Sequence, residues 1–245
     1  MNDKERIYYN SFAKDYHLKR KHPWKPFLDF IEEYIGQGKF HLIKKGICVD
    51  LGCANGRHFE VINSDKNHII GIDSSIAFLS IAKKEQKISD SQTMHLCCAD
   101  MNNLPFRERS VDLILSIAAL HHIKTKKRRR KVMQFLSAIL KEHGHILFSV
   151  WRRWQKKFFK FFLKDKVKRI FCPKYRKRQT KQGLTDFGDK IVPWTVSQTK
   201  ETIHRFYHLF SKRETLKLCK NFQILEFKAI GGPNNRDNFF VLCGK

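Results

Sequence analysis

The sequence predicts an α/β protein with a mostly parallel sheet that is covered by helices on both faces. Between residues 46 and 150, short apolar segments alternate with helical patterns, which is the order of consecutive β–α–β units. The first apolar segment, residues 47–50, ends in an acid and leads into a turn that contains Gly52 and Gly56. The second, residues 69–73, ends in Asp73, about 20 residues after Gly52. We therefore expect a ligand at the carboxyl edge of this sheet.

The turn after the first strand has the composition of a ligand-binding loop. Glycine allows the backbone to approach a ligand closely, because no side chain stands in the way. The pattern Asp-x-Gly-x-x-x-Gly differs from the dinucleotide fingerprint, because residues 53–55 separate its two glycines. A carboxylate at the position of Asp73 is placed to meet the hydroxyl pair of a ribose. Each acid alone could be an ordinary helix cap, but Asp50, Asp73 and Asp100 together predict a nucleoside site.

Two further strands are expected, one from Met94 to Ala99 and one over residues 111–117. The second of them leads into His121 and His122, which would lie where the ligands of open α/β sheets bind. Structural, buried histidines are the alternative interpretation.

The helix predicted after these histidines begins with a basic run, residues 124–131. Positive charge at a helix N-terminus opposes the helix dipole, so this run is not expected to stabilise the helix. It could be a solvated face, a phosphate-binding patch or a nuclear-import signal. The fifth strand is expected over residues 145–150.

Residues 1–45 are expected to form a helical cap. Apolar residues repeat at helical spacing from Trp24 to Ile35, which predicts a helix with one buried face. This cap could simply pack on the sheet. Alternatively it could form a lid, with Tyr9 or Tyr16 against the ligand and Arg20 toward a substrate.

Residues 151–204 interrupt the alternation and form a basic, aromatic insertion. From Trp151 to Lys181 there are fourteen Lys and Arg residues and one Asp, with eight aromatic residues interleaved. Basic side chains neutralise phosphates, and aromatic faces can stack on unpaired bases, so RNA binding is the favoured interpretation. An amphipathic helix on an anionic membrane and aromatic residues that only attach the insertion to the core are the alternatives.

The C-terminal segment is expected to be a short helix followed by a hairpin. Ser211 and Glu214 have the spacing of a capping box, and residues 222–230 and 238–243 have the pattern of two strands.

Composition restricts the function further. The chain has 245 residues and a mass of 29.1 kDa, which suits one domain, residues 1–245. Its 49 Lys and Arg against 23 Asp and Glu give a formal charge of +26, which indicates a polyanionic partner. The seven cysteines include no Cys-x-x-Cys pair, so we expect reduced thiols and no metal site. No apolar run reaches transmembrane length, and we expect a cytoplasmic protein that could also enter the nucleus.

The glycine motif and the acids that follow it resemble the first motifs of the class I S-adenosylmethionine (SAM) methyltransferases. The resemblance implies a Rossmann-like, seven-stranded sheet that an antiparallel strand completes at the C-terminus, and SAM as the cofactor. It also implies that Asp100 reads the adenine amino group. The implied cofactor-binding residues are Tyr9, Asp50, Gly52, Cys53, Gly56, Asp73, Asp100, Met101 and Ser116.

A narrower resemblance spans nearly the whole chain. The sequence is similar to the eukaryotic tRNA methyltransferases that form the methyl ester of 5-carboxymethyluridine at the anticodon wobble position. The matching stretches are residues 9–13, 20–24, 50–56, 100–105, 116–122, 192–194, 205–210 and 236–241, of which the last three are absent from generic methyltransferases. The sequence departs from this family at Ala54, where the family has glycine, and in residues 151–191, which do not align.

This resemblance implies a reaction in which the nucleophile is a carboxylate that is already ionised at neutral pH. Such a nucleophile needs no general base, so the site should position it with cationic and hydrogen-bonding side chains. The candidates in the matching stretches are Arg20, His121, Tyr207, His208, Arg236 and Asn238.

The resemblance also implies two partners, a tRNA anticodon stem-loop and a small zinc-binding activator subunit. The activator would pair with an exposed sheet edge, for which the strand from Met94 to Ala99 is expected. Two other functions remain open: methylation of a small carboxylate or lipid-linked metabolite, and a non-catalytic RNA-binding protein on a methyltransferase fold.

Overall fold

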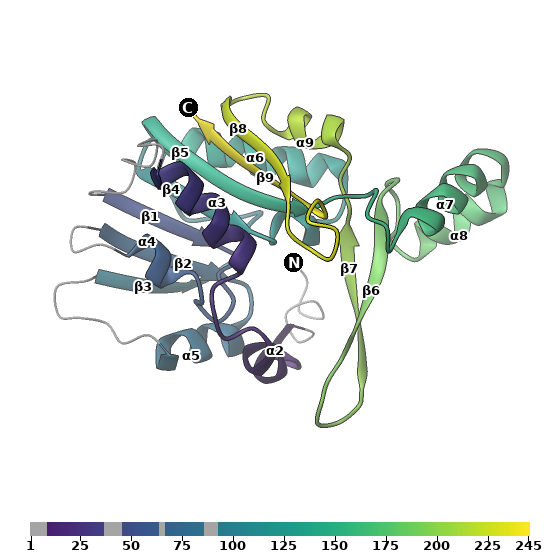
Figure 1. Ribbon diagram of the computed structural model, residues 1–245, viewed down its shortest axis with the longest axis horizontal. Helices are drawn as coiled ribbons and strands as arrows, with labels where there is room; N and C mark the ends of the chain where they lie inside the picture. Colours follow the sequence, from purple (N-terminus) through teal and green to yellow (C-terminus); the bar gives the residue numbers. More distant parts are fainter. Residues whose placement is uncertain (1–8, 37–45, 64–66, 86–92) are drawn as a thin grey trace.

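A computed structural model describes residues 9–36, 46–63, 67–85 and 93–245 of the chain (Figure 1). Its strands are β1 (Gly46–Leu51), β2 (Asn67–Asp73), β3 (Thr93–Cys98), β4 (Val111–Ile117), β5 (Leu140–Trp151), β6 (Asp189–Thr195), β7 (Thr202–His208), β8 (Gln223–Ile230) and β9 (Asn238–Gly244). Its helices are α2 (Ala13–Lys19), α3 (Lys25–Gly36), α4 (Phe59–Ile62), α5 (Ile76–Glu85), the 3-10 turn η2 (Leu120–His122), α6 (Lys126–Ile139), α7 (Phe159–Phe171), α8 (Pro173–Lys181) and α9 (Lys212–Leu218).

Seven strands form one sheet in the order β3-β2-β1-β4-β5-β9-β8. The first five strands in this order are parallel, and β9 pairs antiparallel with both β5 and β8. The predicted α/β architecture and its antiparallel closing strand are therefore confirmed. β3 and β8 form the two outer edges.

Helices cover both faces of this sheet, as the alternating pattern predicted. On one face, α3, α4 and α5 contribute side chains such as Phe27, Phe59 and Leu79 to a buried cluster. On the other face, α6 contributes Val132 and Leu136 to a second cluster. Successive strand residues point to opposite faces, so neighbouring positions on one strand belong to different clusters.

The fifth strand differs from its prediction, because β5 begins at Leu140 and not at residue 145. Helix α6 ends at Ile139 and the chain continues directly as strand. Leu140 pairs with Val111, whereas His145 pairs with Leu113, so residues 141–144 form an irregularity in the strand.

The insertion lies outside the seven-stranded sheet. It consists of α7, α8 and a separate antiparallel pair, β6 and β7. Figure 1 shows α7 and α8 projecting away from the body beyond this pair. The predicted boundary at residue 204 falls inside β7, which continues to His208. After it, the predicted capping box of Ser211 and Glu214 is present at the start of α9.

Candidate functional site

The loop after β1 requires glycine at position 52. The N–H groups of Gly52 and Cys53 both donate to the carbonyl of Ile72, at 2.7 and 3.0 Å, which fixes the loop against β2. Gly52 has a φ of +79°, and a Cβ there would lie 2.5 Å from the Cβ of Ala119. Ala54 also has a positive φ, +49°, although it carries a side chain. The loop thus keeps its left-handed turn at the position where the resembling family has glycine.

Asp73 is oriented by this loop. Its carboxylate accepts hydrogen bonds from the N–H of Ala54 at 3.0 Å and from that of Ser75 at 2.9 Å. Burial raises the pKa of Asp73, and these hydrogen bonds act in the opposite direction. Asp100 follows β3 and accepts from the backbone and the side chain of Asn102, at 3.0 and 2.7 Å. Both acids are held where the parallel strands end.

A cavity of about 620 Å³ lies at the carboxyl ends of the five parallel strands. Its volume is within the range of small-molecule and cofactor sites, and its place is the usual ligand position of an open α/β sheet. The sheet contributes Leu51, Gly52, Ile72, Asp73, Ala99, Asp100, Met101, Ile117, Ala119 and Trp151 to its wall. The remaining wall comes from α2, the start of α6 and the β6–β7 pair.

Asp50 lies beneath the loop and is fully buried. Its Oδ2 atom has no hydrogen-bond partner among the residues that the structure describes. Burial and the nearby carboxylate of Asp73 raise the pKa of Asp50 to about 7, although Arg57 acts in the opposite direction. Asp50 does not line the cavity, so this unpaired acceptor lies within the core beneath the loop, where a negative charge is unfavourable.

Comparisons with known proteins agree with this geometry. A family model described as a methyltransferase domain matches residues 49–148. A SAM-dependent methyltransferase from Clostridium acetobutylicum superposes with a TM-score of 0.64 at 16% identity, over 96% of this chain and 98% of that one. The N-methyltransferase NodS of Bradyrhizobium japonicum in complex with S-adenosyl-L-homocysteine gives 0.59 at 13% identity, over 97% and 98%.

The chain therefore contains a methyltransferase domain and has the class I fold of the SAM-dependent methyltransferases. Its cofactor is SAM, for which the residues present are suited. Gly52 would leave room for the close approach of this ligand, the carboxylate of Asp73 would face its ribose, and Asp100 would face its adenine. When bound, SAM supplies a methyl group on a sulfonium, which is electrophilic without further activation.

Some proteins of similar sequence have names that state a more specific reaction. The chain is 27% identical over 241 residues to the tRNA (carboxymethyluridine(34)-5-O)-methyltransferase of Schizosaccharomyces pombe, covering 97% of this chain and 94% of that protein. It is 26% identical over 239 residues to a putative methyltransferase of Encephalitozoon cuniculi, covering 97% and 93%. A Xenopus tropicalis tRNA (carboxymethyluridine(34)-5-O)-methyltransferase is 26% identical, and the matched region is only 36% of its length.

The substrate side of the methyltransferase cavity is aromatic. The ring of Tyr207 stacks on His121 with centroids 4.7 Å apart, and Trp151 lies 4.6 Å from the same tyrosine ring. Burial lowers the pKa of His121 well below its usual value, and His122, Arg205 and His208 lower it further, so the ring is neutral at neutral pH. Its Nδ1 atom is buried and has no hydrogen-bond partner in the described part of the chain.

Arg205 is a site residue that the sequence analysis missed. It lies on β7, lines the methyltransferase cavity and is only 7% exposed. Its guanidinium lies 4.7 Å from the ring of Trp194, 5.1 Å from that of Tyr207 and 5.7 Å from that of Phe12. Its Nε atom has no hydrogen-bond partner, and within the described part of the chain it forms no ion pair. The signal available in the sequence was an arginine directly before two aromatic residues, Phe206 and Tyr207.

The two interpretations of the N-terminal segment, a wall over the ligand and a helix packed on the sheet, apply to different parts of it. Tyr9, Phe12, Tyr16 and Arg20 line the cavity, so the region of α2 forms a wall over the ligand site. The side chain of Asp15 ties this wall to the insertion by accepting from Trp194 Nε1 and Ser197 N, both at 2.8 Å.

Helix α3 instead packs on the sheet. Phe27, Phe30 and Ile31 are buried in the cluster on its face. The side chain of Ile35 lies outside the described residues.

Of the predicted cofactor residues, Tyr9, Gly52, Asp73, Asp100 and Met101 line the cavity. The others lie behind its wall. Cys53, Ser116 and Asp50 are buried, and a Cβ on Gly56 would contact the ring of Phe59. These four support the loop and the strand ends from within the core.

Of the predicted substrate residues, Arg20, His121 and Tyr207 line the cavity, and the other three do not. Arg236 is exposed, and its carbonyl accepts from Arg152 Nη1 at 3.2 Å. Asn238 is buried and donates to the carbonyl of Ile230 at 3.3 Å, at the start of β9.

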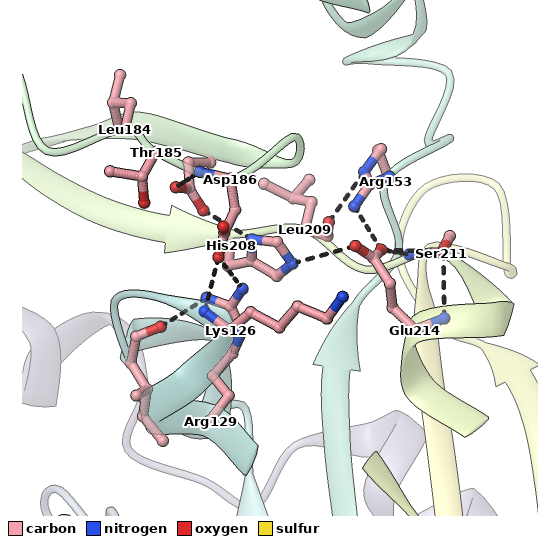
Figure 2. A network of polar contacts seen from close by, with 12 residues as sticks. Lys126, Arg129, Arg153, Leu184, Thr185, Asp186, His208, Leu209, Ser211 and Glu214 are labelled. Carbon is pink, nitrogen blue, oxygen red and sulfur yellow. Dashed lines mark hydrogen bonds and ion pairs between the residues drawn. The ribbon is translucent and has the colours of Figure 1, made fainter. Parts of the chain in front are cut away.

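His208 belongs to a buried polar network on the other side of β7 (Figure 2). Its Nδ1 bonds to Asp189 Oδ1 at 2.7 Å, and burial lowers its pKa to about 3, which nearby Arg129 and Arg153 also favour. Ligand atoms of Asp186, Asp189 and His208 lie within 4.8 Å of one another. The carboxylate of Asp186 already accepts from Arg129 Nη2 at 2.6 Å, so arginine occupies one position that a cation would need.

Most aromatic residues of the insertion pack α7 and the segment before it against the β6–β7 pair. Five of them, Trp151, Trp154, Phe158, Phe161 and Phe162, belong to a cluster that also contains Tyr207 and Leu209. Phe159 and Phe171 are exposed. Stacking on bases is therefore open to few of the side chains that the sequence analysis considered for it.

Proposed function

We propose that this methyltransferase forms the methyl ester of 5-carboxymethyluridine at the wobble position of tRNA. The observation that carries the proposal is Arg205, a guanidinium inside the cavity without an acidic partner among the described residues. Buried arginines are usually paired, because leaving a buried charge uncompensated is unfavourable. A substrate carboxylate would supply the missing partner through paired, charge-assisted hydrogen bonds. The names of the S. pombe and X. tropicalis relatives support the same substrate.

The reaction suits a site that positions its substrate, because it needs no base. A carboxylate is ionised at neutral pH, so no proton has to be removed before it attacks. Arg205 would hold one edge of the carboxylate and leave the other oxygen free toward the methyl group. The aromatic walls formed by Tyr207, Trp151 and Trp194 exclude water, which strengthens this ion pair.

The projecting helices supply a surface for the tRNA backbone. Helices α7 and α8 carry ten Lys and Arg residues and one acid, Asp165. Asp165 accepts from Arg169 Nε and from the hydroxyl of Tyr175, both at 2.8 Å, so it joins the two helices to each other. The ten cations thus lie on two helices that are joined to each other, where they can contact phosphates of the tRNA backbone.

The decisive experiment is mass spectrometry of wobble uridines. The purified protein, with its activator if one is needed, is incubated with SAM and with tRNA that carries 5-carboxymethyluridine. A gain of one methyl group on that nucleoside supports the proposal. Transfer to a base or ribose of the same tRNA, or to free small carboxylates only, would refute it.

We also propose that β3 binds the small zinc-binding activator. β3 is an outer strand of the sheet, so one side of its backbone has no strand partner among the described residues. An edge of this kind can accept a strand from another protein. We expect poor solubility of the chain alone and rescue by co-expression. A monomeric chain that is soluble and fully active alone would contradict this part of the proposal.

One observation favours a second candidate, methylation of a carboxylate held at a membrane surface. Phe159, Leu163, Val167, Ile170 and Phe171 form an exposed apolar stripe on α7 between lysines. Basic amphipathic helices of this kind can lie on anionic lipid. No helix in the described residues is long and apolar enough to cross a membrane. Co-sedimentation with anionic vesicles at physiological salt would favour this candidate, and tRNA methylation without vesicles would favour the first.

A further inference from the structure

A second cavity, of about 320 Å³, lies between α6 and α9. It is separate from the methyltransferase cavity and borders the network around His208 (Figure 2). Six basic side chains line it, against one carboxylate, that of Glu214; the six are Lys126, Arg129, Arg130, Arg153, Arg213 and Lys217. We call this space the basic cavity.

The floor of the basic cavity is formed by two buried arginines. Arg129 is 3% exposed and donates to Asp186 Oδ2 at 2.6 Å and to the carbonyl of Ile123 at 2.9 Å. Arg153 is 4% exposed, donates to the carbonyl of Leu209 at 3.1 Å and pairs with Glu214. These bonds fix the floor, so its positive charge is held in place.

Glu214 does not neutralise the rim. Its carboxylate pairs with Arg153 and also accepts from the N–H and the hydroxyl of Ser211, both at 2.9 Å. His208 adds no charge of its own at neutral pH, because burial keeps its pKa at about 3.

The rim consists of Lys126, Arg130, Arg213 and Lys217. Their side chains are exposed, and none of them forms an ion pair with any residue that the structure describes. Like charges gathered around one hollow repel each other, and this repulsion is relieved when an anion enters.

The start of α6 directs one basic run toward both cavities. Lys124 and Arg128 line the methyltransferase cavity, whereas Lys126, Arg129 and Arg130 line the basic cavity. The first turn of this helix contains no acidic residue, so its dipole is opposed by its own side chains. The N–H of Lys126 donates to Asp186 Oδ2 at 2.7 Å and that of Arg128 to Thr125 Oγ1 at 3.4 Å, so the attraction for an anion at this end comes from the charged side chains.

We propose that the basic cavity binds a phosphate group. Phosphate combines the negative charge and the acceptor oxygens that arginine and lysine side chains recognise together. Two sources carry this chemistry: the backbone of the tRNA, which rests on the proposed function, and a free phosphate or small phosphorylated molecule. The shared basic run places a backbone phosphate beside the cavity that would hold the wobble nucleoside.

The test compares two triple variants of the full chain. R130Q/R213Q/K217Q removes three exposed cations of the rim. K14Q/K83Q/K84Q removes three exposed cations from the region of α2 and α5, away from α6 and α9 in Figure 1. For both variants and the wild type, the melting temperature is measured in potassium phosphate and in potassium chloride of equal ionic strength. The dissociation constant for unmodified tRNA is then measured from about 50 to 200 mM salt.

In the wild type and the control variant, phosphate at about ten times its Kd should raise Tm by about 3–6 °C over chloride. The rim variant should show no such rise. If a tRNA phosphate is the natural ligand, the rim variant should also bind tRNA about tenfold more weakly at low salt, with a log–log salt slope shallower by about one. The control variant should keep the wild-type slope.

A rise in Tm that the rim variant loses, with unchanged tRNA binding, supports the site and assigns it to a free phosphate or small phosphorylated molecule. No phosphate-specific rise in the wild type, or an equal rise in the rim variant, overturns the proposal. The thermal arm does not depend on catalysis. A chain that binds phosphate here but leaves 5-carboxymethyluridine unmodified would refute only the proposed function.

Discussion

Tyr207 and His208 are neighbours on β7, and their side chains lie on opposite faces of that strand. The ring of Tyr207 stacks on His121 in the methyltransferase cavity, and Nδ1 of His208 bonds to Asp189 at 2.7 Å beside the basic cavity. Side chains alternate along a strand, so Arg205 shares the face of Tyr207. β7 therefore forms the wall between the two cavities and gives each its own set of polar side chains.

The first prediction concerns Arg205. Arg205→Lys keeps the positive charge but loses the planar, paired donors that hold a carboxylate. We expect kcat/KM for tRNA carrying 5-carboxymethyluridine to fall about 100-fold, which corresponds to about 2.7 kcal/mol of transition-state stabilisation. The Kd for SAM, measured by calorimetry, should stay within about twofold of the wild type.

Arg236→Lys is the matched control. Arg236 lies in a stretch shared with the tRNA methyltransferases, but it is exposed and does not line the cavity. We expect its kcat/KM to stay near the wild-type value. A larger loss at Arg236 than at Arg205 would show that the substrate carboxylate is bound outside the cavity that we assign to it.

The sequence predicted the part of the site that follows from strand ends. Asp73 and Asp100 come directly after buried strands, and the carboxyl ends of parallel strands meet at one edge, so their grouping could be inferred. Gly52 was identifiable because a tight turn with close contacts needs glycine, and the 2.5 Å approach of Ala119 bears this out.

The substrate side could not be predicted in the same way. It depends on which face of β7 points toward the cavity, and a short strand gives no sign of this in its own pattern. His208 and Tyr207 therefore looked equally suitable, and Arg205 was passed over. The positions of Arg205, Tyr207 and His208 depend on how the β6–β7 pair is placed beside the cavity. The buried aromatic cluster around Phe162 packs against this pair and helps to fix it.

The second prediction concerns the pH dependence of methyl transfer. Burial holds the pKa of His121 well below its usual value and raises that of Tyr207 to about 12, so neither side chain titrates between pH 6 and 9. A substrate carboxylate with an ordinary pKa is fully ionised in this range. We expect kcat at saturating SAM and tRNA to be nearly constant from pH 6 to 9 in stopped time-course assays.

His121→Asn should lower kcat about tenfold, because it removes the ring that stacks on Tyr207, while leaving this flat profile unchanged. A wild-type kcat that rises tenfold per pH unit near neutrality, and loses that rise in the variant, would assign His121 the role of a base and contradict the positioning mechanism.

The third prediction concerns Asp50. Its pKa is raised to about 7 by burial and by Asp73, whereas an unfolded aspartate titrates near pH 4. The folded state thus holds the proton more tightly, so this group contributes stability that is fully present below about pH 4 and is lost as the pH rises through 7. Asp50→Asn cannot ionise and should lack this loss.

The measurement is the melting temperature of both proteins without SAM from pH 5 to 8. The Tm of the variant minus that of the wild type should increase as the pH rises through about 7. A difference between the two that stays constant over this range would show that the carboxyl group of Asp50 does not titrate there in the folded protein.

The last prediction concerns Ala54, whose φ of +49° places a side-chain-bearing residue in the left-handed region. That conformation costs a non-glycine residue about 1–2 kcal/mol, and glycine avoids the cost. Glycine also has more freedom in the unfolded chain, which offsets about 0.4–1 kcal/mol. Ala54→Gly should therefore stabilise the fold by about 0.5–1 kcal/mol in urea unfolding. Its SAM affinity should remain within about twofold, because the N–H bond from residue 54 to Asp73 is a backbone bond.

Ala138→Gly in α6 is the control for a general effect of glycine. Ala138 lies in an α-helix, where the same substitution lowers stability by about 0.5–1 kcal/mol. Opposite signs at the two positions would show that the gain at residue 54 comes from its left-handed backbone. Destabilisation at both would mean that the loop does not hold the conformation seen here, and the orientation of Asp73 by that loop would then need another explanation.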